Sequence, residues 1–196
     1  MWTGDLPLPQ RGLLVLGSPL GSPEFVARHV AERMTTESAL LDQIALLPDT
    51  QCAWLLLSMC ANPRADHLLR SLPPSQSLPY AETHDSAVWR TFLRLLGDSV
   101  APDLFTRFRV CLSGCLGGLG LRSAVSTARP AYWAAWADAL PILRTRVPEI
   151  ARLAVTQLQR GERAQPSCLR EAALAGLFLD GIGFSARPSW PSLFDG

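Results

Sequence analysis

The apolar positions of this chain begin with one short run that has no helical spacing. Residues 13–16 are consecutive apolar residues closed by Gly17, and Ser18 and Pro19 supply turn chemistry before Leu20. A short apolar run followed by turn residues and a second apolar position is typical of a β-hairpin. The pattern therefore predicts a two-stranded ribbon near the N-terminus.

Helical spacing starts immediately after this ribbon. Ser22 stands where a helix N-cap is expected, and Pro23 occupies the first helical position. Apolar side chains then fall on one helical stripe at Val26, Val30, Met34, Leu41 and Ile44. We expect a long first helix that runs to about residue 47 and stops at Pro48.

The next segments alternate between apolar helices and proline-rich breaks. Residues 49–50 can cap a helix over 52–60, which is apolar on every side and is therefore expected to be buried by its neighbours. The Asn-Pro pair at 62–63 predicts a break before a shorter helix over 65–72. Residues 73–79 contain three prolines and predict an extended loop.

The rest of the chain continues the helical pattern. We expect helices over 83–96, from 102–103 to just before 114, briefly after Ser123, and over 130–146, 149–159 and 169–180. The predicted fold is all-α, an irregular multi-helix bundle with a short N-terminal β-hairpin. Its parts are an N-terminal segment with the hairpin (1–22), a helical domain (23–182, with an internal loop near 73–80) and a loose C-terminal tail (183–196).

Composition narrows the class of protein. With 196 residues and 48% hydrophobic content the chain is long enough to form a packed core. Its 18 cations, all arginines, nearly balance 17 acidic residues, so net charge alone does not indicate nucleic-acid binding. The odd number of cysteines, five, favours a reduced intracellular setting, cytoplasmic or nuclear. The longest uncharged apolar run, 52–61, is shorter than the ~20 residues of a membrane span.

The sequence contains no recognisable catalytic or cofactor motif. There is no Asp-Asp pair, no G-x-S-x-G, no C-x-x-C and no H-E-x-x-H, and the glycine-rich segment 114–120 lacks the Lys-Ser/Thr of a phosphate-binding loop. Cys111 and Cys115 have a possible metal-ligand spacing, but no His pair completes a zinc site. The chain is therefore predicted to be no enzyme and to carry neither metal nor cofactor.

Arginine pairs are the remaining candidates for binding. Arg64 with Arg70, and Arg90 with Arg94, are expected to share exposed helix faces, where a guanidinium can meet a phosphate. The alternative is that these are ordinary solvated helix faces. The tryptophans at 54, 89, 133 and 136 lie within apolar stripes and are expected in the core rather than on a stacking surface.

A series of sequence blocks resembles the region after the catalytic palm in non-LTR (LINE-type) retrotransposon reverse transcriptases. The blocks lie within residues 2–146, at Trp2–Pro7, Gly12–Gly21, Pro23–Val26, Gln51–Leu57, Ala61–Ala65, His84–Trp89, Gly117–Ser123 and Ala131–Pro141. The resemblance implies that the hairpin is similar to the primer grip, with Gly17 and Pro19 shaping its turn. It further implies that the following helices form a thumb and connection region.

By the same resemblance, the helix with Arg64 and Arg70 approaches the backbone of an RNA or DNA template–primer duplex, and Arg122 of the Gly117–Ser123 block is a further contact. The family's Tyr/Phe-x-Asp-Asp motif lies upstream of the hairpin, so the resemblance implies a non-catalytic, truncated region. The alternative is a helical protein–protein interaction module without nucleic-acid binding. An arginine-lined concavity favours the first function, and an exposed apolar patch or groove favours the second.

Overall fold

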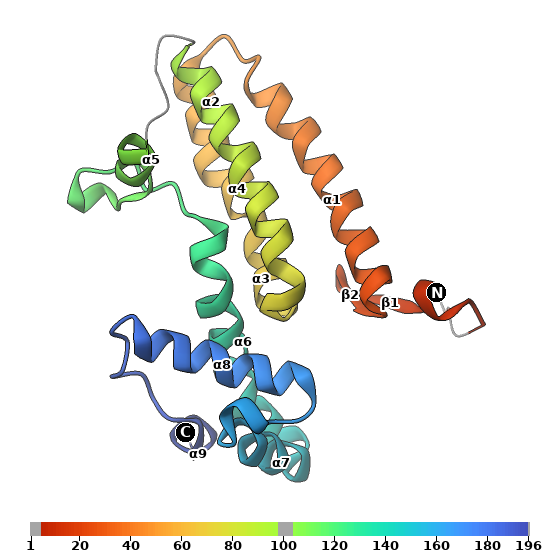
Figure 1. The fold of residues 1–196 in the computed structure, drawn as a ribbon. Coiled ribbons are helices and arrows are strands. Elements are labelled where there is room, and N and C mark those ends of the chain that lie inside the picture. Colours follow the sequence, from red (N-terminus) through yellow and green to blue (C-terminus); the bar gives the residue numbers. More distant parts are fainter. Residues whose placement is uncertain (1–4, 98–103, 196) are drawn as a thin grey trace. The chain divides into compact units, whose positions relative to one another are not determined.

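The computed structural model describes residues 5–97 and 104–195, which form helices and one β-hairpin (Figure 1). The all-α class with a short N-terminal hairpin is thereby confirmed. The chain divides into two compact units where the sequence predicted one helical domain over 23–182. Unit 1 is Met1–His67 with Leu78–Val125, and unit 2 is Leu68–Ser77 with Ser126–Gly196.

The hairpin pairs β1 (Gly12–Val15) with β2 (Ser18–Gly21), after a short 3₁₀ turn, η1 (Leu8–Gln10). The strands are antiparallel, with Leu14 opposite Pro19. The turn is Leu16-Gly17, with φ of 50° and 83°, so the prediction of a turn at Ser18-Pro19 is wrong. Two left-handed residues match the twist of a two-residue hairpin, and Pro19 faces a partner with which it exchanges no hydrogen bond.

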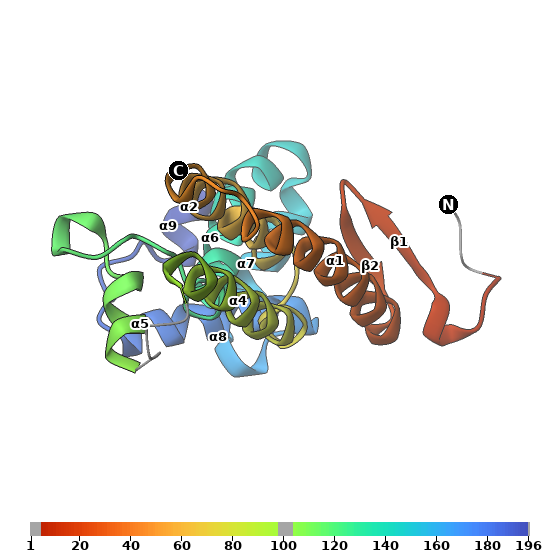
Figure 2. The same cartoon turned by 90° about the horizontal axis from the view of Figure 1, so that it is seen from above.

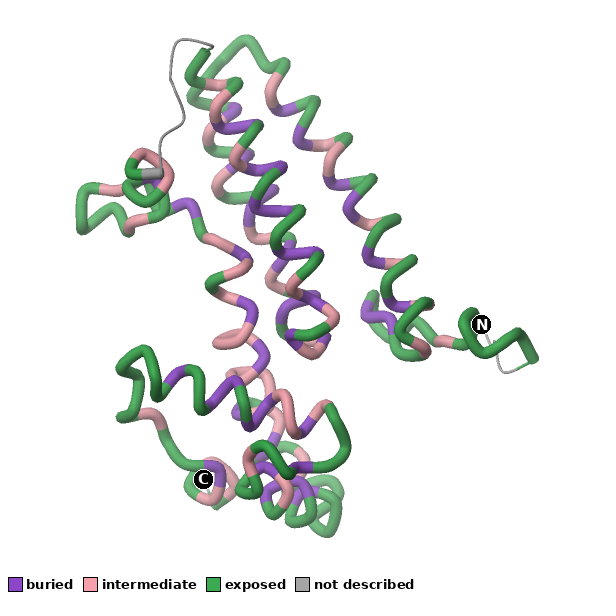
Figure 3. Tube along the Cα trace, in the orientation of Figure 1, coloured by how far each residue is buried: buried purple, intermediate pink, exposed green. Residues whose placement is uncertain are grey.

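Helix α1 (Pro23–Ile44) begins as predicted and ends three residues before residue 47. The Ser22 hydroxyl accepts a hydrogen bond from the Phe25 backbone N–H at 3.1 Å, which satisfies one of the free donors at the helix start. All five predicted stripe residues are buried, and buried stretches recur along α1 in Figure 3. Glu37 lies on the same buried stripe.

The second helical segment is continuous where a break was predicted. It runs from α2 (Thr50–Leu55) through a π-helical turn, η2 (Leu56–Ala61), and a 3₁₀ turn, η3 (Asn62–Ala65), into α3 (Asp66–Ser71). Pro63 is tolerated because it stands at the start of the 3₁₀ turn. The prediction of burial on every side is also wrong, since Met59 is 73% exposed.

Helix α4 (Pro74–Leu96) replaces the loop predicted near 73–80. Pro74 occupies the helix start, and Glu171 accepts hydrogen bonds from the Ser75 backbone N–H (2.7 Å) and hydroxyl (2.6 Å). This contact within unit 2 stabilises a helix start that has no local capping signal. The helix ends at Leu96, before Gly97, as predicted.

Beyond α4, the expected helix start at 102–103 lies outside the described residues. Helix α5 (Leu104–Cys111) and the 3₁₀ turn η4 (Gly114–Leu116) lead to α6 (Ala124–Arg146). Helix α6 is uninterrupted at Pro130, where a restart was predicted. The remaining elements are α7 (Pro148–Leu158), η5 (Gly161–Arg163), α8 (Ser167–Gly181) and α9 (Trp190–Asp195).

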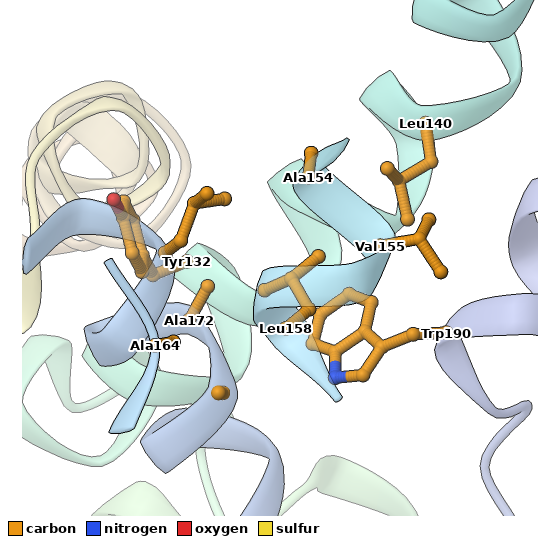
Figure 4. Packing of buried hydrophobic residues seen from close by; sticks show 10 residues of the cluster. Tyr132, Leu140, Ala154, Val155, Leu158, Ala164, Ala172 and Trp190 are labelled. Carbon is orange, nitrogen blue, oxygen red and sulfur yellow. The ribbon is translucent and has the colours of Figure 1, made fainter. Parts of the chain in front are cut away.

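Unit 2 has its own apolar core (Figure 4). Trp190 of α9 is 7% exposed and packs into a cluster with Leu158 of α7 and Leu140 of α6. The Arg144 guanidinium donates to the carbonyl oxygens of Phe194, at 2.8 Å, and Asp195. The prediction of a loose tail over 183–196 is therefore wrong for α9, because a buried indole and a helix C-cap hold it.

Candidate nucleic-acid interface

Residues of α1 and α4 in unit 1 line a groove. The two helices lie side by side in both views (Figures 1 and 2). The volume of the groove is about 320 Å³. The lining residues are Ser38, Leu41 and Asp42 of α1, and Ala87, Arg90, Thr91 and Arg94 of α4. The groove is thus a concavity that contains one of the two predicted arginine pairs.

Arg90 and Arg94 lie on one exposed face, as the sequence predicted. The Arg94 guanidinium donates to Asp42 across the groove at 2.8 Å, with 46% and 67% of the two side chains exposed. Within residues 5–97 and 104–195, no carboxylate forms an ion pair with Arg90. The groove therefore offers one unpaired guanidinium beside one that a carboxylate already orients.

A buried polar cluster joins the same two helices. The carboxylate of Glu37 on α1 is 3% exposed and accepts hydrogen bonds from Arg33 Nε (2.9 Å), the Tyr80 hydroxyl (2.7 Å) and His84 Nδ1 (3.2 Å). The other ring nitrogen of His84 lies 3.1 Å from the Asn62 carbonyl oxygen. Both ring nitrogens of His84 thus lie within hydrogen-bond distance of an oxygen atom.

The charges of this cluster follow from its hydrogen bonds. Burial raises the pKa of Glu37, but the hydrogen bonds from His84, Tyr80 and Arg33 together outweigh it and leave the pKa below its ordinary value. Burial, followed by the contact with Glu37, raises the pKa of Tyr80 well above its ordinary value. At neutral pH Glu37 is therefore an ionised acceptor and Tyr80 a neutral donor.

Three of the blocks that carry the family resemblance meet through hydrogen bonds. The Asn62 side chain donates to the Arg122 carbonyl at 2.8 Å and accepts from the Arg122 N–H at 3.0 Å. Asp85 accepts from the Ser123 hydroxyl and the Ala124 N–H, each at 2.7 Å. Ser123 precedes α6 as predicted, and Asp85 of α4 supplies a carboxylate that accepts from the first N–H group of that helix.

The remaining predicted arginines have different surroundings. Arg64 is exposed, and its carbonyl oxygen accepts from Arg33 Nη2 at 3.0 Å. Arg122 lies 3.3 Å from Asp66, next to the turn that carries Arg64. Arg70 belongs to unit 2 and forms an ion pair with Asp138 at 2.6 Å. Arg64 and Arg70 are both exposed, as predicted, but they belong to different units.

The two residues that were predicted to shape the hairpin turn, Gly17 and Pro19, differ in position. Gly17 forms the turn, whereas Pro19 is buried inside β2. The Ser18 hydroxyl lies 3.0 Å from His67 Nε2, which ties β2 to α3 within unit 1. Leu16, at the tip, is 92% exposed.

Sequence reasoning missed the buried cluster. Glu37 follows Met34 and precedes Leu41 on the α1 stripe, and His84 lies between Ala81 and Val88 on an equally buried stripe of α4. A polar residue at a core-facing position was the available signal. Its partner could not be found from sequence, because the two stripes are far apart along the chain.

The four tryptophans predicted in the core, at 54, 89, 133 and 136, are half-buried rather than buried. In unit 1, Trp54 and Trp89 pack on Phe92. The ring centroids of Trp54 and Trp89 lie 5.7 and 5.4 Å from that of Phe92. All five cysteines are free thiols, and all except the half-buried Cys168 are exposed.

Across residues 5–97 and 104–195, no group of three or more His, Cys, Asp or Glu side chains could hold a metal ion. None of the helices in the described ranges combines the length and apolar composition needed to cross a membrane.

Comparison of the chain with protein-family models, curated proteins and solved structures yields no match. The function must therefore be argued from the groove and the residues around it.

Proposed function

We propose that this chain is a non-catalytic, thumb-like helical protein that weakly contacts the phosphate backbone of an RNA or DNA template–primer duplex through the α1–α4 groove. The observation that carries the proposal is the concavity that holds Arg90 and Arg94 together. The planar guanidinium group is suited to phosphate, to which it donates in pairs.

The surroundings of the two arginines define how strong this contact is. Arg94 must exchange Asp42 for a phosphate, and an exposed ion pair of this kind contributes only about 0–1 kcal/mol. Arg90 has no such partner to lose among the described residues. With a net charge of +1, little long-range attraction adds to these contacts. The proposal therefore predicts weak binding that falls steeply with salt.

The meeting of three resemblance blocks around Asn62 and Asp85 also supports the proposal. Blocks that are far apart in sequence contribute to one hydrogen-bond network in unit 1. The network places Arg122 beside Asp66 and the turn with Arg64, where it offers a second cationic contact. The proposed setting is intracellular, cytoplasmic or nuclear, and the contact needs no cofactor.

The test is fluorescence anisotropy with a short RNA–DNA hybrid at low and rising salt. Arg90→Ala and Arg94→Ala are each expected to weaken binding and to reduce the magnitude of the salt slope by about one phosphate contact. Asp42→Asn is expected to strengthen binding, because it removes the competing carboxylate. Arg163→Ala, an exposed arginine in unit 2, serves as the control and should change nothing. Undetectable binding at low salt, or variants that bind like the wild type, would overturn the proposal.

The exposed apolar hairpin favours a second candidate function, protein binding through a second copy of this chain. Leu13, Leu14, Val15 and Leu20 are 41–52% exposed, and Leu16 exceeds them. Residues 12–21 carry no charge, so two hairpins can meet without like-charge repulsion. Sedimentation equilibrium should then show a dimer that Leu14→Ser with Leu16→Ser abolishes, with Leu153→Ser, at a leucine of unit 2 that is 65% exposed, as the control. A monomer at all concentrations excludes this function.

A further inference from the structure

The arginine groove and the buried Glu37 cluster are built on the same two helices of unit 1. Glu37 directly precedes Ser38, the first groove residue of α1. On α4, Tyr80 and His84 lie just before Ala87, where the groove lining begins. The buried cluster therefore adjoins the groove residues along both α1 and α4.

Two sets of side-chain contacts join these walls. At one place Tyr80 and His84 donate from α4 to the buried carboxylate of Glu37. At the other, Arg94 donates from α4 to the exposed Asp42. The exposed ion pair is easily exchanged with water, whereas the buried carboxylate cannot leave its donors without leaving them unpaired. The cluster is thus the stronger constraint on the separation of α1 and α4.

We propose that Glu37 is a positioning residue for the groove, which sets the separation of α1 and α4 at which Arg90 and Arg94 hold a single phosphate group between them. This inference rests on the proposed function. The two guanidinium groups project from adjacent turns of one helix, so one anion can reach both. The far wall, with Ser38 and Asp42, decides whether a tetrahedral anion fits beside them.

The charged and titratable groups that face Glu37 come from both helices. Arg33 lies on α1, and Tyr80 and His84 lie on α4. The Asn62 carbonyl of η3 lies against the far nitrogen of His84. Glu37→Gln keeps the size of the side chain but removes the charge that these donors share. Tyr80→Phe is the milder change, since it removes one hydroxyl and keeps the ring.

The experiment follows the side-chain Nε–H resonances of Arg90 and Arg94 by nitrogen-15 NMR, with inorganic phosphate as the probe. In the wild type, Asp42→Asn should shift the Arg94 resonance, because it removes the ion pair. In the Glu37→Gln and Tyr80→Phe backgrounds, Asp42→Asn should shift the Arg94 resonance clearly less. The affinity of these two variants for phosphate should also fall several-fold. Tyr80→Phe provides the answer if Glu37→Gln does not fold.

Tyr132→Phe is the matched control. It removes a buried tyrosine hydroxyl that donates to the Cys168 carbonyl at 3.2 Å, but in unit 2. Tyr132→Phe should leave the Asp42-dependent shift of the Arg94 resonance and the phosphate affinity at their wild-type values. The control shows whether loss of a tyrosine hydroxyl outside the Glu37 cluster alters the groove, whereas a positioning role predicts the effect only in the Glu37 cluster variants.

Two outcomes would count against the inference, and they are distinguishable. Cluster variants that keep the Asp42-dependent shift and the wild-type phosphate affinity overturn the positioning role while the proposed function stands. A wild-type chain in which phosphate moves neither arginine resonance overturns the proposed function, and the positioning role with it.

Discussion

The carboxylate of Asp85, in the interior of α4, accepts a hydrogen bond of 2.7 Å from the backbone N–H of Ala124, the first residue of α6. Its second oxygen accepts from the Ser123 hydroxyl at 2.7 Å and the Val125 N–H at 3.2 Å. The first N–H groups of a helix have no partner within it, and negative charge is favoured there. A side chain on one helix thus determines where another begins.

Removal of this carboxylate should destabilise unit 1. Asp85→Ala leaves the Ala124 and Val125 N–H groups without an acceptor, at a cost of about 1–3 kcal/mol in the free energy of unfolding. Urea denaturation measures the loss, and hydrogen exchange should show faster exchange at those two amides. Asp138→Ala, which breaks only an exposed ion pair with Arg70, should cost about 0–1 kcal/mol. Equal losses in the two variants would contradict the capping role.

The Glu37 cluster should make stability sensitive to acid. The pKa of Glu37 is lower in the folded chain than its ordinary value of 4.5, so the unfolded chain binds more protons between these two values. The stability contributed by Glu37 is present above pH 4.5 and is lost as the pH falls through the folded pKa. For the wild type, the urea concentration at the unfolding midpoint should fall as the pH is lowered from 4.5 through the folded pKa of Glu37. Glu37→Gln should flatten this dependence, and an unchanged profile would show that Glu37 does not cause it.

The tyrosines should remain neutral until the folded chain opens. The sequence contains two, and burial raises the pKa of both, that of Tyr132 to about 12. Because the folded state keeps the proton, the stability from Tyr132 is full below pH 10 and is lost as the pH rises through 12. Ultraviolet absorbance of tyrosinate should therefore appear late, together with unfolding. In Tyr80→Phe the remaining transition should belong to Tyr132, and tyrosinate formation near pH 10 without unfolding would contradict this prediction.

The hairpin should depend on a glycine that has no room for a side chain. A Cβ on Gly21 would overlap the Arg11 carbonyl group and the Gly12 Cα atom. Gly21→Ala should therefore cost about 1–3 kcal/mol through local overpacking, measured by thermal denaturation. Gly114→Ala is the control, because a Cβ there meets nothing within 4 Å, and it should stay within about 0.5 kcal/mol of the wild type. If the two substitutions have equal effects, the close approach is not what requires Gly21.

Helix α9 should detach when its anchor is removed. Trp190 is 7% exposed in the core of unit 2, so Trp190→Ala should cost about 3–5 kcal/mol if that core does not collapse around the cavity. Limited proteolysis should then cleave the chain near α9 much faster than in the wild type. Phe184→Ala changes a side chain that is 63% exposed and should leave the cleavage rate unchanged. Slow cleavage in Trp190→Ala would show that other contacts hold the helix.

Local chemistry determined the parts of the fold that were predicted correctly. The Ser22 cap, Pro23 and the apolar stripe all lie within α1, and each acts over one helical turn. The end of α4 at Leu96 is equally local, because Gly97 follows it with a φ of 81°. These signals need no partner from elsewhere in the chain, so the sequence is sufficient to read them.

Long-range contacts decided the segments that were predicted wrongly. Residues 74–80 contain two prolines and predict a loop, but Glu171 satisfies the start of α4 from a position far along the chain. The hairpin turn was misplaced because Pro19 is compatible with both a turn and an edge strand, and the pairing with Leu14 decides between them.

The candidate site likewise has one feature that the sequence predicts and others that depend on the tertiary structure. The sequence alone determined that Arg90 and Arg94 share an exposed face, since the helical repeat of 3.6 residues places them one turn apart. Only the tertiary structure showed that α1 supplies the opposite wall, with Asp42 on Arg94 and Glu37 buried beside the groove. The physical reason is that a helical period specifies which residues share a face, whereas the partner of that face depends on packing between segments far apart in the chain.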